Sequence, residues 1–296
     1  MIKNILITGC KGQLGHEMQL QSQLAENSAY TYFFTDVEEL DITDESAIDA
    51  FVDAHSIDCI VNCAAYTNVD KAESNESLCH LLNGVAPGYL AKSIARRGGA
   101  MIHVSTDYVF DGTNHTPYHE DETTCPCSVY GRTKLEGEQA VVSACSNAVI
   151  IRTAWLYSRF GGNFVKTMMR LGREREALNV VFDQVGTPTY ARDLATAISA
   201  IIRHGIVPGI YHFSNEGVTS WYDFTLSIHR HAGIETCKVS PIHTSEYPTP
   251  ATRPHFSVLD KSKIKATYAI SIPHWEDSLK ECVDELLSEE QSEPSN

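Results

Sequence analysis

Short apolar runs alternate with helical stretches through the first half of the chain. Five runs are nearly continuous in apolar residues, as is typical of strands buried on both faces: "NILIT", "YTYFFTD", "DCIVNCAA", "AMIHVSTDYVF" and "AVIIRTAWLY". Between them we expect helices from about Gly12 to Leu24, over "SAIDAFVDAH", in a long segment ending near Arg97, and over residues 128–145. Strands and helices in this order predict a parallel sheet covered on both faces.

This alternation indicates an α/β fold, with a doubly wound parallel sheet of the Rossmann type over residues 1–158. After residue 158 Pro and Gly become more frequent, as in "QVGTPTY" and "EYPTPATRP". We therefore expect residues 159–290 to form mainly a smaller α/β substrate-binding domain, some of whose segments cross back to the sheet. Residues 291–296 are expected to end the chain as an acidic, frayed tail.

Charge and composition exclude some classes of protein. The 296 residues carry a formal net charge of -15 and no basic run, which argues against nucleic acid as a partner. The start "MIKNILITGCKG" lacks a signal-peptide pattern, and no apolar run approaches the ~18 residues that a membrane helix requires. We expect a cytoplasmic protein with no membrane partner, whose nine scattered cysteines stay reduced.

Neither the cysteines nor the 13 histidines predict a metal site. Cys125 and Cys127 form the close pair "CPC" but have no second pair at metal-site spacing, so we expect them to be loop residues. His229 and His231, in "IHRHAG", are expected on the polar face of a helix.

The first predicted strand leads into a turn rich in glycine. In "ITGCKGQLG", Gly9, Gly12 and Gly15 are spaced so that the backbone between strand and helix can turn tightly and approach a pyrophosphate. Asp36 ends the second strand, where a carboxylate can accept hydrogen bonds from an adenosine ribose. The pattern predicts a dinucleotide cofactor, and the alternative is a turn of purely structural use.

A tyrosine and a lysine stand four residues apart in "SVYGRTKLEGE". In a helix opened by Ser128, this spacing places Tyr130 and Lys134 side by side, and we expect Glu136 and Glu138 to point elsewhere. The pair can be ordinary packing or an acid tuned by an ammonium group. The spacing alone leaves both interpretations open.

Thr106 falls at the carboxyl end of the strand that contains "MIHVS". Its hydroxyl can reach the predicted crevice and donate to a carbonyl oxygen, although a threonine at this place can equally close a turn. Taken in order, the glycine turn, Thr106 and Tyr130-x-x-x-Lys134 resemble the extended short-chain dehydrogenase/reductase family over essentially the whole chain.

Six motifs narrow the resemblance: "NCAAYTNVDKAE", "STDYVFDG", "YGRTKLEGE", "RTAWLY", "GTPTYARDLA" and "ATRPHFSVLD". Together they are similar to the members of that family that reduce nucleotide sugars. The resemblance implies NADH or NADPH as cofactor, and reduction of the 4-keto group of dTDP-4-dehydro-L-rhamnose to dTDP-L-rhamnose. It makes Tyr130 the general acid and Thr106 the residue that polarises the carbonyl. Lys134 then lowers the pKa of the phenol and holds the nicotinamide ribose.

The resemblance also implies which other residues surround the two ligands. Around the cofactor, it places Lys11, Gly12, Gln13 and Leu14 at the pyrophosphate, Asp41 and Ile42 near the adenine, and Ala64, Ala65 and Tyr66 along the remaining length. Around the nucleotide-sugar substrate, it places Thr106, Asp107 and Trp155 in the sugar pocket and Arg253 at the diphosphate.

Two other functions remain open at this point. Dehydratases of the family carry a glutamate two residues after the catalytic threonine, and here that position is Tyr108, a poor base at neutral pH. This argues against a dehydratase but leaves an epimerase open. The chain also resembles the regulatory β subunit of methionine adenosyltransferase, which would make it a non-catalytic binding partner.

The sequence constrains the cofactor preference, the metal dependence and the oligomeric state only in part. Asp36 is followed by "VEELD", which offers no cation to bind the 2′-phosphate of NADPH, so we expect NADH to be preferred and NADPH tolerated. Some relatives use magnesium at a dimer interface, but no cluster of ligands here assigns magnesium. The sequence likewise does not determine whether the protein forms a homodimer.

Overall fold

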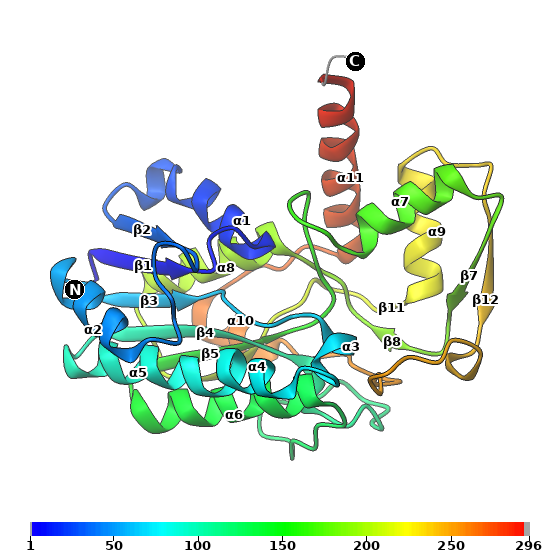
Figure 1. The fold of residues 1–296 in the computed structure, drawn as a ribbon. Helices are drawn as coiled ribbons and strands as arrows, with labels where there is room; N and C mark the ends of the chain where they lie inside the picture. The colour runs from blue at the N-terminus through cyan, green and yellow to red at the C-terminus, as the bar shows by residue number, and fades with distance from the viewer. Residues whose placement is uncertain (1, 293–296) are drawn as a thin grey trace.

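The computed structural model describes residues 2–292, and a parallel sheet of six strands forms its centre (Figure 1). In spatial order the strands are β2 (Thr31–Thr35), β1 (Asn4–Thr8), β3 (Cys59–Asn62), β4 (Ala100–Thr106), β5 (Ala148–Thr153) and β10 (Gly209–His212). The order reverses between β1 and β3, which is the switch point where doubly wound sheets bind their ligands. The predicted fold class is confirmed.

Helices cover both faces of the sheet (Figure 1). One face carries α1 (Gln13–Ser22), α8 (Ala191–His204) and α10 (Ser262–Tyr268), and the other carries α2 (Glu45–Ala54), α5 (Ala86–Arg96) and α6 (Val129–Ala144). Along β1, Ile5 and Ile7 pack on the first face while Leu6 packs on the second. Burial on both faces explains why the strands read as continuous apolar runs.

Most elements from the second half of the chain form a lobe beyond the carboxyl ends of the strands (Figure 1). It contains α7 (Phe164–Glu174), α9 (Trp221–His231), α11 (Trp275–Ser292), β7 (Ala177–Val181), β12 (Lys238–Ile242), β8 (Val185–Gly186) and β11 (Thr219–Ser220). The short strands β6 (Leu156–Tyr157) and β9 (Thr189–Tyr190) pair where the chain leaves and re-enters the sheet domain. A separate apolar cluster around Tyr157, Phe224 and Trp275 forms the core of this lobe.

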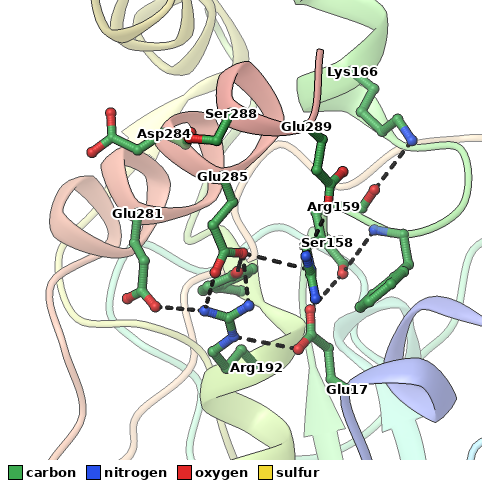
Figure 2. Close-up of polar contacts among 12 residues, drawn as sticks. Glu17, Ser158, Arg159, Lys166, Arg192, Glu281, Asp284, Glu285, Ser288 and Glu289 are labelled. Carbon is green, nitrogen blue, oxygen red and sulfur yellow. Dashed lines mark hydrogen bonds and ion pairs between the residues drawn. The ribbon is translucent and has the colours of Figure 1, made fainter. Parts of the chain in front are cut away.

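Charged side chains around the buried Glu17 connect the two parts of the chain (Figure 2). Glu17 on α1 is 1% exposed and accepts hydrogen bonds from Ser158 Oγ at 2.8 Å and Arg192 Nε at 3.4 Å. Arg192, on α8, also pairs at 2.7 Å with Glu281 and with Glu285 on α11. The helix that follows the glycine turn is thus tied to the lobe.

Two elements differ from the sequence predictions. The strand predicted over "AMIHVSTDYVF" ends at Thr106, because Thr106 Oγ1 accepts the Tyr108 N–H and caps a 3-10 turn over Asp107–Val109. The long helix that ends near Arg97 is interrupted: α3 (Val69–Ala72) and α4 (Glu76–His80) precede a π-helical turn, Leu81–Val85, which leads into α5. Such π turns are frequent at functional sites.

Two smaller expectations also need correction. His229 does not face water: it is 4% exposed, and its Nε2 lies 3.1 Å from the Met168 carbonyl oxygen. The helix α11 continues through Gln291 and Ser292, where the acidic tail was expected to begin, and residues 293–296 lie outside the described part. Within residues 2–292, every helix is too short or too polar to cross a membrane.

Candidate active site

The glycine turn lies at the switch point, between the ends of β1 and β3. Gly9 has φ = +66°, and a Cβ there would lie 2.7 Å from the Ala64 backbone, so a larger residue would clash. A Cβ on Gly15 would lie 2.3 Å from the Gly9 carbonyl oxygen, so this glycine lets α1 begin directly against the turn. Gly12 caps α1 without a side chain. The unpaired N–H groups of a first helical turn can then face a pyrophosphate.

The next two residues of the turn have different surroundings. Leu14 is 4% exposed and packs into the core, so its backbone is what can meet a ligand. The Gln13 side chain accepts a hydrogen bond at 3.0 Å from Asn163 Nδ2, at the start of α7. Gln13, one of the residues expected at the pyrophosphate, therefore contacts the second lobe as well.

Asp36 is bound to the turn itself. Its Oδ2 accepts the Lys11 N–H at 3.0 Å, and its Oδ1 accepts the Val37 N–H at 2.9 Å. The Lys11 ammonium turns away to Glu38, 2.6 Å from Oε2, and this hydrogen bond raises the pKa of Lys11. The end of β2 thus presents a carboxylate beside the cofactor turn with its nearest cation already paired.

The residues expected near the adenine differ in exposure. Asp41 is exposed, and hydrogen bonds from the Thr43 N–H at 2.9 Å and the Thr43 hydroxyl at 2.7 Å lower its pKa. Ile42 is 7% exposed and belongs to the core beneath α2. The Ile42 side chain is therefore packed in the core, and Asp41 is the residue of this pair that offers a polar group at the surface.

The segment after β3 is held by two buried asparagines. The Ala64 N–H donates to Asn62 Oδ1 at 3.2 Å. Asn83 Oδ1 accepts the Tyr66 N–H at 2.8 Å, and Asn83 Nδ2 donates to the Tyr66 carbonyl at 3.0 Å. Ala64, Ala65 and Tyr66 stay partly exposed along the rim. Asn83 lies in the π-helical turn, so this turn holds the backbone of the segment after β3 in place.

Thr106 and Asp107 lie at the end of β4. Both are buried, and Thr106 Oγ1 donates to Asp107 Oδ1 at 3.0 Å. Asp107 Oδ2 is buried without a hydrogen-bond partner among the described residues. Burial raises the pKa of Asp107 to about 6, although the nearby side chains of Ser257 and Thr106 work against the rise. An unsatisfied buried oxygen of this kind is suited to a ligand hydroxyl.

Tyr130 stands in the first turn of α6, opposite Thr106. Ser128 caps the helix as predicted, since its Oγ accepts the Gly131 N–H at 3.1 Å. A Cβ on Gly131 would lie 2.2 Å from the Tyr108 carbonyl oxygen, so this glycine lets α6 approach the end of β4. Burial raises the pKa of Tyr130, and a hydrogen bond with the Thr106 side chain opposes the rise. Tyr130 therefore keeps its proton at neutral pH.

Lys134 is 2% exposed, one helical turn after Tyr130. Its Nζ donates to the Val104 carbonyl at 2.7 Å and lies 3.5 Å from His103 Nε2. Burial lowers the pKa of Lys134 to about 8, and the nearby Glu138 carboxylate opposes that shift. The ammonium group therefore changes charge just above neutral pH.

His103 links Lys134 to the glycine turn. Asn62 Oδ1 accepts the Thr8 hydroxyl at 2.7 Å as well as a backbone N–H, so its Nδ2 donates to His103 Nδ1 at 3.0 Å. With Nδ1 accepting, a neutral His103 carries its proton on Nε2, which faces Lys134. Burial, and then the positive charge of Lys134, hold the pKa of His103 well below its usual value.

Trp155 makes the bend between β5 and β6 in a left-handed conformation, with φ = +47°. Such a conformation costs a bulky residue about 1–2 kcal/mol, so it requires strong neighbours. Trp155 stacks on Trp221, with ring centroids 3.5 Å apart and planes 8° from parallel. A Cβ on Gly186 would also lie 2.8 Å from the Trp155 ring. The indole is thereby fixed at the border between sheet and lobe.

Arg253 lies at the same site, in the loop that precedes residue 254. Its Nη1 donates to the Tyr108 hydroxyl at 3.2 Å, and its Nη2 pairs with Asp70 Oδ2 at 2.7 Å. The ring of Tyr108 meets that of Tyr130 edge to face, with centroids 5.5 Å apart. Arg253 is therefore connected to the catalytic candidates through one side chain.

The structure thus brings Thr106, Asp107, Tyr130 and Lys134 together at the end of β4. Sequence reasoning missed several residues of this region: the buried polar residues Asn62, Asn83, His103, Glu138 and Arg152, and the partly buried Trp221. The spacing of Glu138 four residues after Lys134 places both on one helix face, but nothing local in the sequence indicates its buried partners Arg152 and Ser105. Asn83 and Trp221 come from distant segments and gave no signal.

This arrangement suits reduction of a carbonyl group. A protonated phenol and a threonine hydroxyl converge on one point, and a glycine cradle for a dinucleotide lies on the neighbouring strands. Within residues 2–292, no group of three or more His, Cys, Asp or Glu side chains is placed to hold a metal ion.

Comparison with known proteins gives consistent results. The family model described as RmlD substrate binding domain matches residues 3–288. A dTDP-4-dehydrorhamnose reductase from Aggregatibacter actinomycetemcomitans is 40% identical over 93% of this chain and 97% of that protein. A probable dTDP-4,6-dihydroxy-2-methyloxan-3-one 4-ketoreductase from Streptomyces antibioticus is 42% identical, over 96% of each. The crystal structure of dTDP-4-dehydrorhamnose reductase from Bacillus anthracis in complex with NADP has a TM-score of 0.91 and 38% identity, and covers 96% of this chain and 100% of that one.

Proposed function

The chain belongs to the RmlD substrate binding domain family, and we propose that it reduces dTDP-4-dehydro-L-rhamnose to dTDP-L-rhamnose with NAD(P)H. Reduction of a keto group on a sugar nucleotide with a nicotinamide cofactor follows from the relatives as a class. The observation that carries the finer proposal is the meeting of Thr106 and Tyr130 at the end of β4, beside the glycine turn.

Thr106, Tyr130 and Lys134 each have a separate role in the reduction. The nicotinamide cofactor, when bound, supplies the hydride. The Thr106 hydroxyl polarises the 4-keto oxygen, and Tyr130 gives its proton to the alkoxide that forms. Lys134 holds the ribose and favours the phenolate that remains on Tyr130.

The surrounding residues bind the two ligands. Gly9, Gly12 and Gly15 give the pyrophosphate access to the start of α1, and Asp36 accepts the ribose hydroxyls of the cofactor. On the substrate, Asp107 Oδ2 accepts a sugar hydroxyl. Trp155 covers the sugar with its ring, and Arg253 binds the diphosphate through the side of its guanidinium that Asp70 leaves free.

Tyr108 distinguishes this site from that of a dehydratase. Burial raises the pKa of Tyr108 to about 12, so it cannot remove a proton from the sugar at neutral pH. Its hydroxyl also accepts a hydrogen bond from Arg253. A second candidate, reduction of a different dTDP-4-keto sugar, is favoured by the 42% identity to the Streptomyces antibioticus ketoreductase.

The test is oxidation of NADH and of NADPH by the purified protein, with dTDP-4-dehydro-L-rhamnose and a second dTDP-4-keto sugar compared side by side. We expect oxidation that depends on the rhamnose precursor and yields dTDP-L-rhamnose. Oxidation with the second sugar alone would move the assignment to that substrate. Cofactor binding without turnover would support a regulatory subunit and contradict the proposal.

A further inference from the structure

Glu138 shares a stripe of α6 with the two catalytic candidates. Tyr130, Lys134 and Glu138 follow each other at four-residue spacing, which places them on one face of the helix. The prediction that Glu138 points elsewhere is wrong, since it is 2% exposed. Glu136 does turn away and binds His80 Nδ1 at 2.7 Å.

The Glu138 carboxylate is bound by two strands at once. Arg152 on β5 donates from Nε to Oε1 at 2.9 Å and from Nη2 to Oε2 at 2.7 Å, a bidentate pair. Ser105 on β4 donates to Oε1 at 2.5 Å. Ser105 directly precedes Thr106, so this contact ties α6 to the strand end that carries the threonine.

Stability alone is a poor reason for this arrangement. Replacing a buried ion pair by apolar residues of similar volume is often neutral or stabilising, because removing both charges from water is costly. Glu138 and Arg152 are each 2% exposed, so the full cost applies. The pair instead fixes the distance between α6 and the ends of β4 and β5.

We propose that Glu138, held by Arg152 and Ser105, is a positioning residue for the reduction: it sets Tyr130 and Lys134 against Thr106 and places a carboxylate on the helix stripe that carries the Lys134 ammonium. This inference rests on the proposed function. It concerns residues that do not touch either ligand.

The charges around Lys134 support this role. The groups that act on its ammonium from the surrounding elements are His103 on β4, Cys63 after β3, Cys79 on α4 and Glu138 on α6 itself. His103 turns an N–H toward the ammonium and cannot stabilise its charge. Among the groups that raise the pKa of Lys134, Glu138 has the largest effect.

The test is the ionisation of Lys134 in Glu138→Gln, which keeps the side-chain shape and removes the charge. The Lys134 Nζ resonance is followed by ¹⁵N-lysine NMR against pH and assigned with Lys134→Arg. We expect the midpoint to fall by about one pH unit. The basic limb of kcat/KM should move with it, and at pH 8 the rate should drop about fivefold.

Glu17→Gln is the matched control. Glu17 is also buried, with a serine donor at 2.8 Å and an arginine at 3.4 Å, but it lies on α1 beside the lobe (Figure 2). This variant should lose stability without moving the Lys134 midpoint. If Glu138→Gln does not fold, the double variant Glu138→Gln with Arg152→Met leaves no unpaired charge. The midpoint should still fall there, by less.

An unchanged midpoint in a folded variant that lacks Glu138 would overturn the inference, as would an equal fall in Glu17→Gln. The NMR titration does not depend on turnover. A wild-type protein that reduces no keto sugar would therefore remove the proposed function, while the titration would still decide whether Glu138 controls Lys134.

Discussion

Tyr130 is a protonated acid over the whole neutral range, because burial raises the pKa of its phenol. In Tyr130→Phe the ring remains and the proton donor is lost. Turnover should fall by roughly 10²–10⁴, the usual contribution of a general acid. The Kd for NADH should change little, since the pyrophosphate and ribose contacts stay. Turnover within a few-fold of wild type would remove Tyr130 from the mechanism.

The pKa of Lys134 predicts how the activity depends on pH. Its pKa, lowered to about 8 by burial, means that the ammonium is present below pH 8 and lost above it. Activity that needs the charged form should therefore decline as pH rises through about 8. Lys134→Arg keeps its charge at any working pH, so the remaining activity of this variant should show no such decline. A basic limb at the same pH in both proteins would assign it to another group.

Asp36 predicts the cofactor preference. Its carboxylate is held beside the turn by the Lys11 N–H, and the Lys11 ammonium is engaged by Glu38. The 2′-phosphate of NADPH would meet like charge there. We expect a higher kcat/KM with NADH, and a shift toward NADPH in Asp36→Ala. Measuring both cofactors on both proteins tests this, and a wild type that prefers NADPH with no change in the variant would contradict it.

At the scale of elements, α6 shows what a sequence does and does not reveal. Its start at Ser128 and the neighbouring positions of Tyr130 and Lys134 could be predicted, because capping and helical spacing are local. The inward position of Glu138 could not, since a buried carboxylate requires the distant Arg152 and Ser105. The π-helical turn before α5 likewise depends on what packs against it.

A substitution at Gly137 tests how closely α6 packs against the π-helical turn. A Cβ at this position would lie 2.0 Å from the Asn83 carbonyl oxygen in the π-helical turn. In an open helix Gly→Ala stabilises by up to about 1 kcal/mol. Here overpacking should reverse the sign, and Gly137→Ala should lower the free energy of unfolding by about 1–3 kcal/mol. Gly162→Ala, with nothing within 4 Å, is the control in chemical denaturation. If Gly137→Ala and wild type had the same free energy of unfolding, the π-helical turn would have shifted to accommodate the added methyl group. That result would contradict the prediction.

At the scale of the whole molecule, the strands of the sheet were predictable, whereas the smaller second domain was expected without its individual strands. Strands buried on both faces leave a continuous apolar signal, as in "NILIT", whereas β6, β8, β9 and β11 are two residues long and leave none. The last strand, β10, and the helices α8 and α10 join the sheet domain from the second half of the chain. His229 was misplaced for a related reason, because its partner on α7 is remote in sequence.

We propose that the two halves of the chain place a nicotinamide cofactor beside a sugar nucleotide and that hydride passes between them. The most direct measurement is the transfer of label from [4,4-²H₂]NADH during turnover with dTDP-4-dehydro-L-rhamnose. We expect one deuterium at C4 of the dTDP-L-rhamnose formed, detected by NMR and mass spectrometry. Product without deuterium, or no product while the cofactor stays bound, would contradict it.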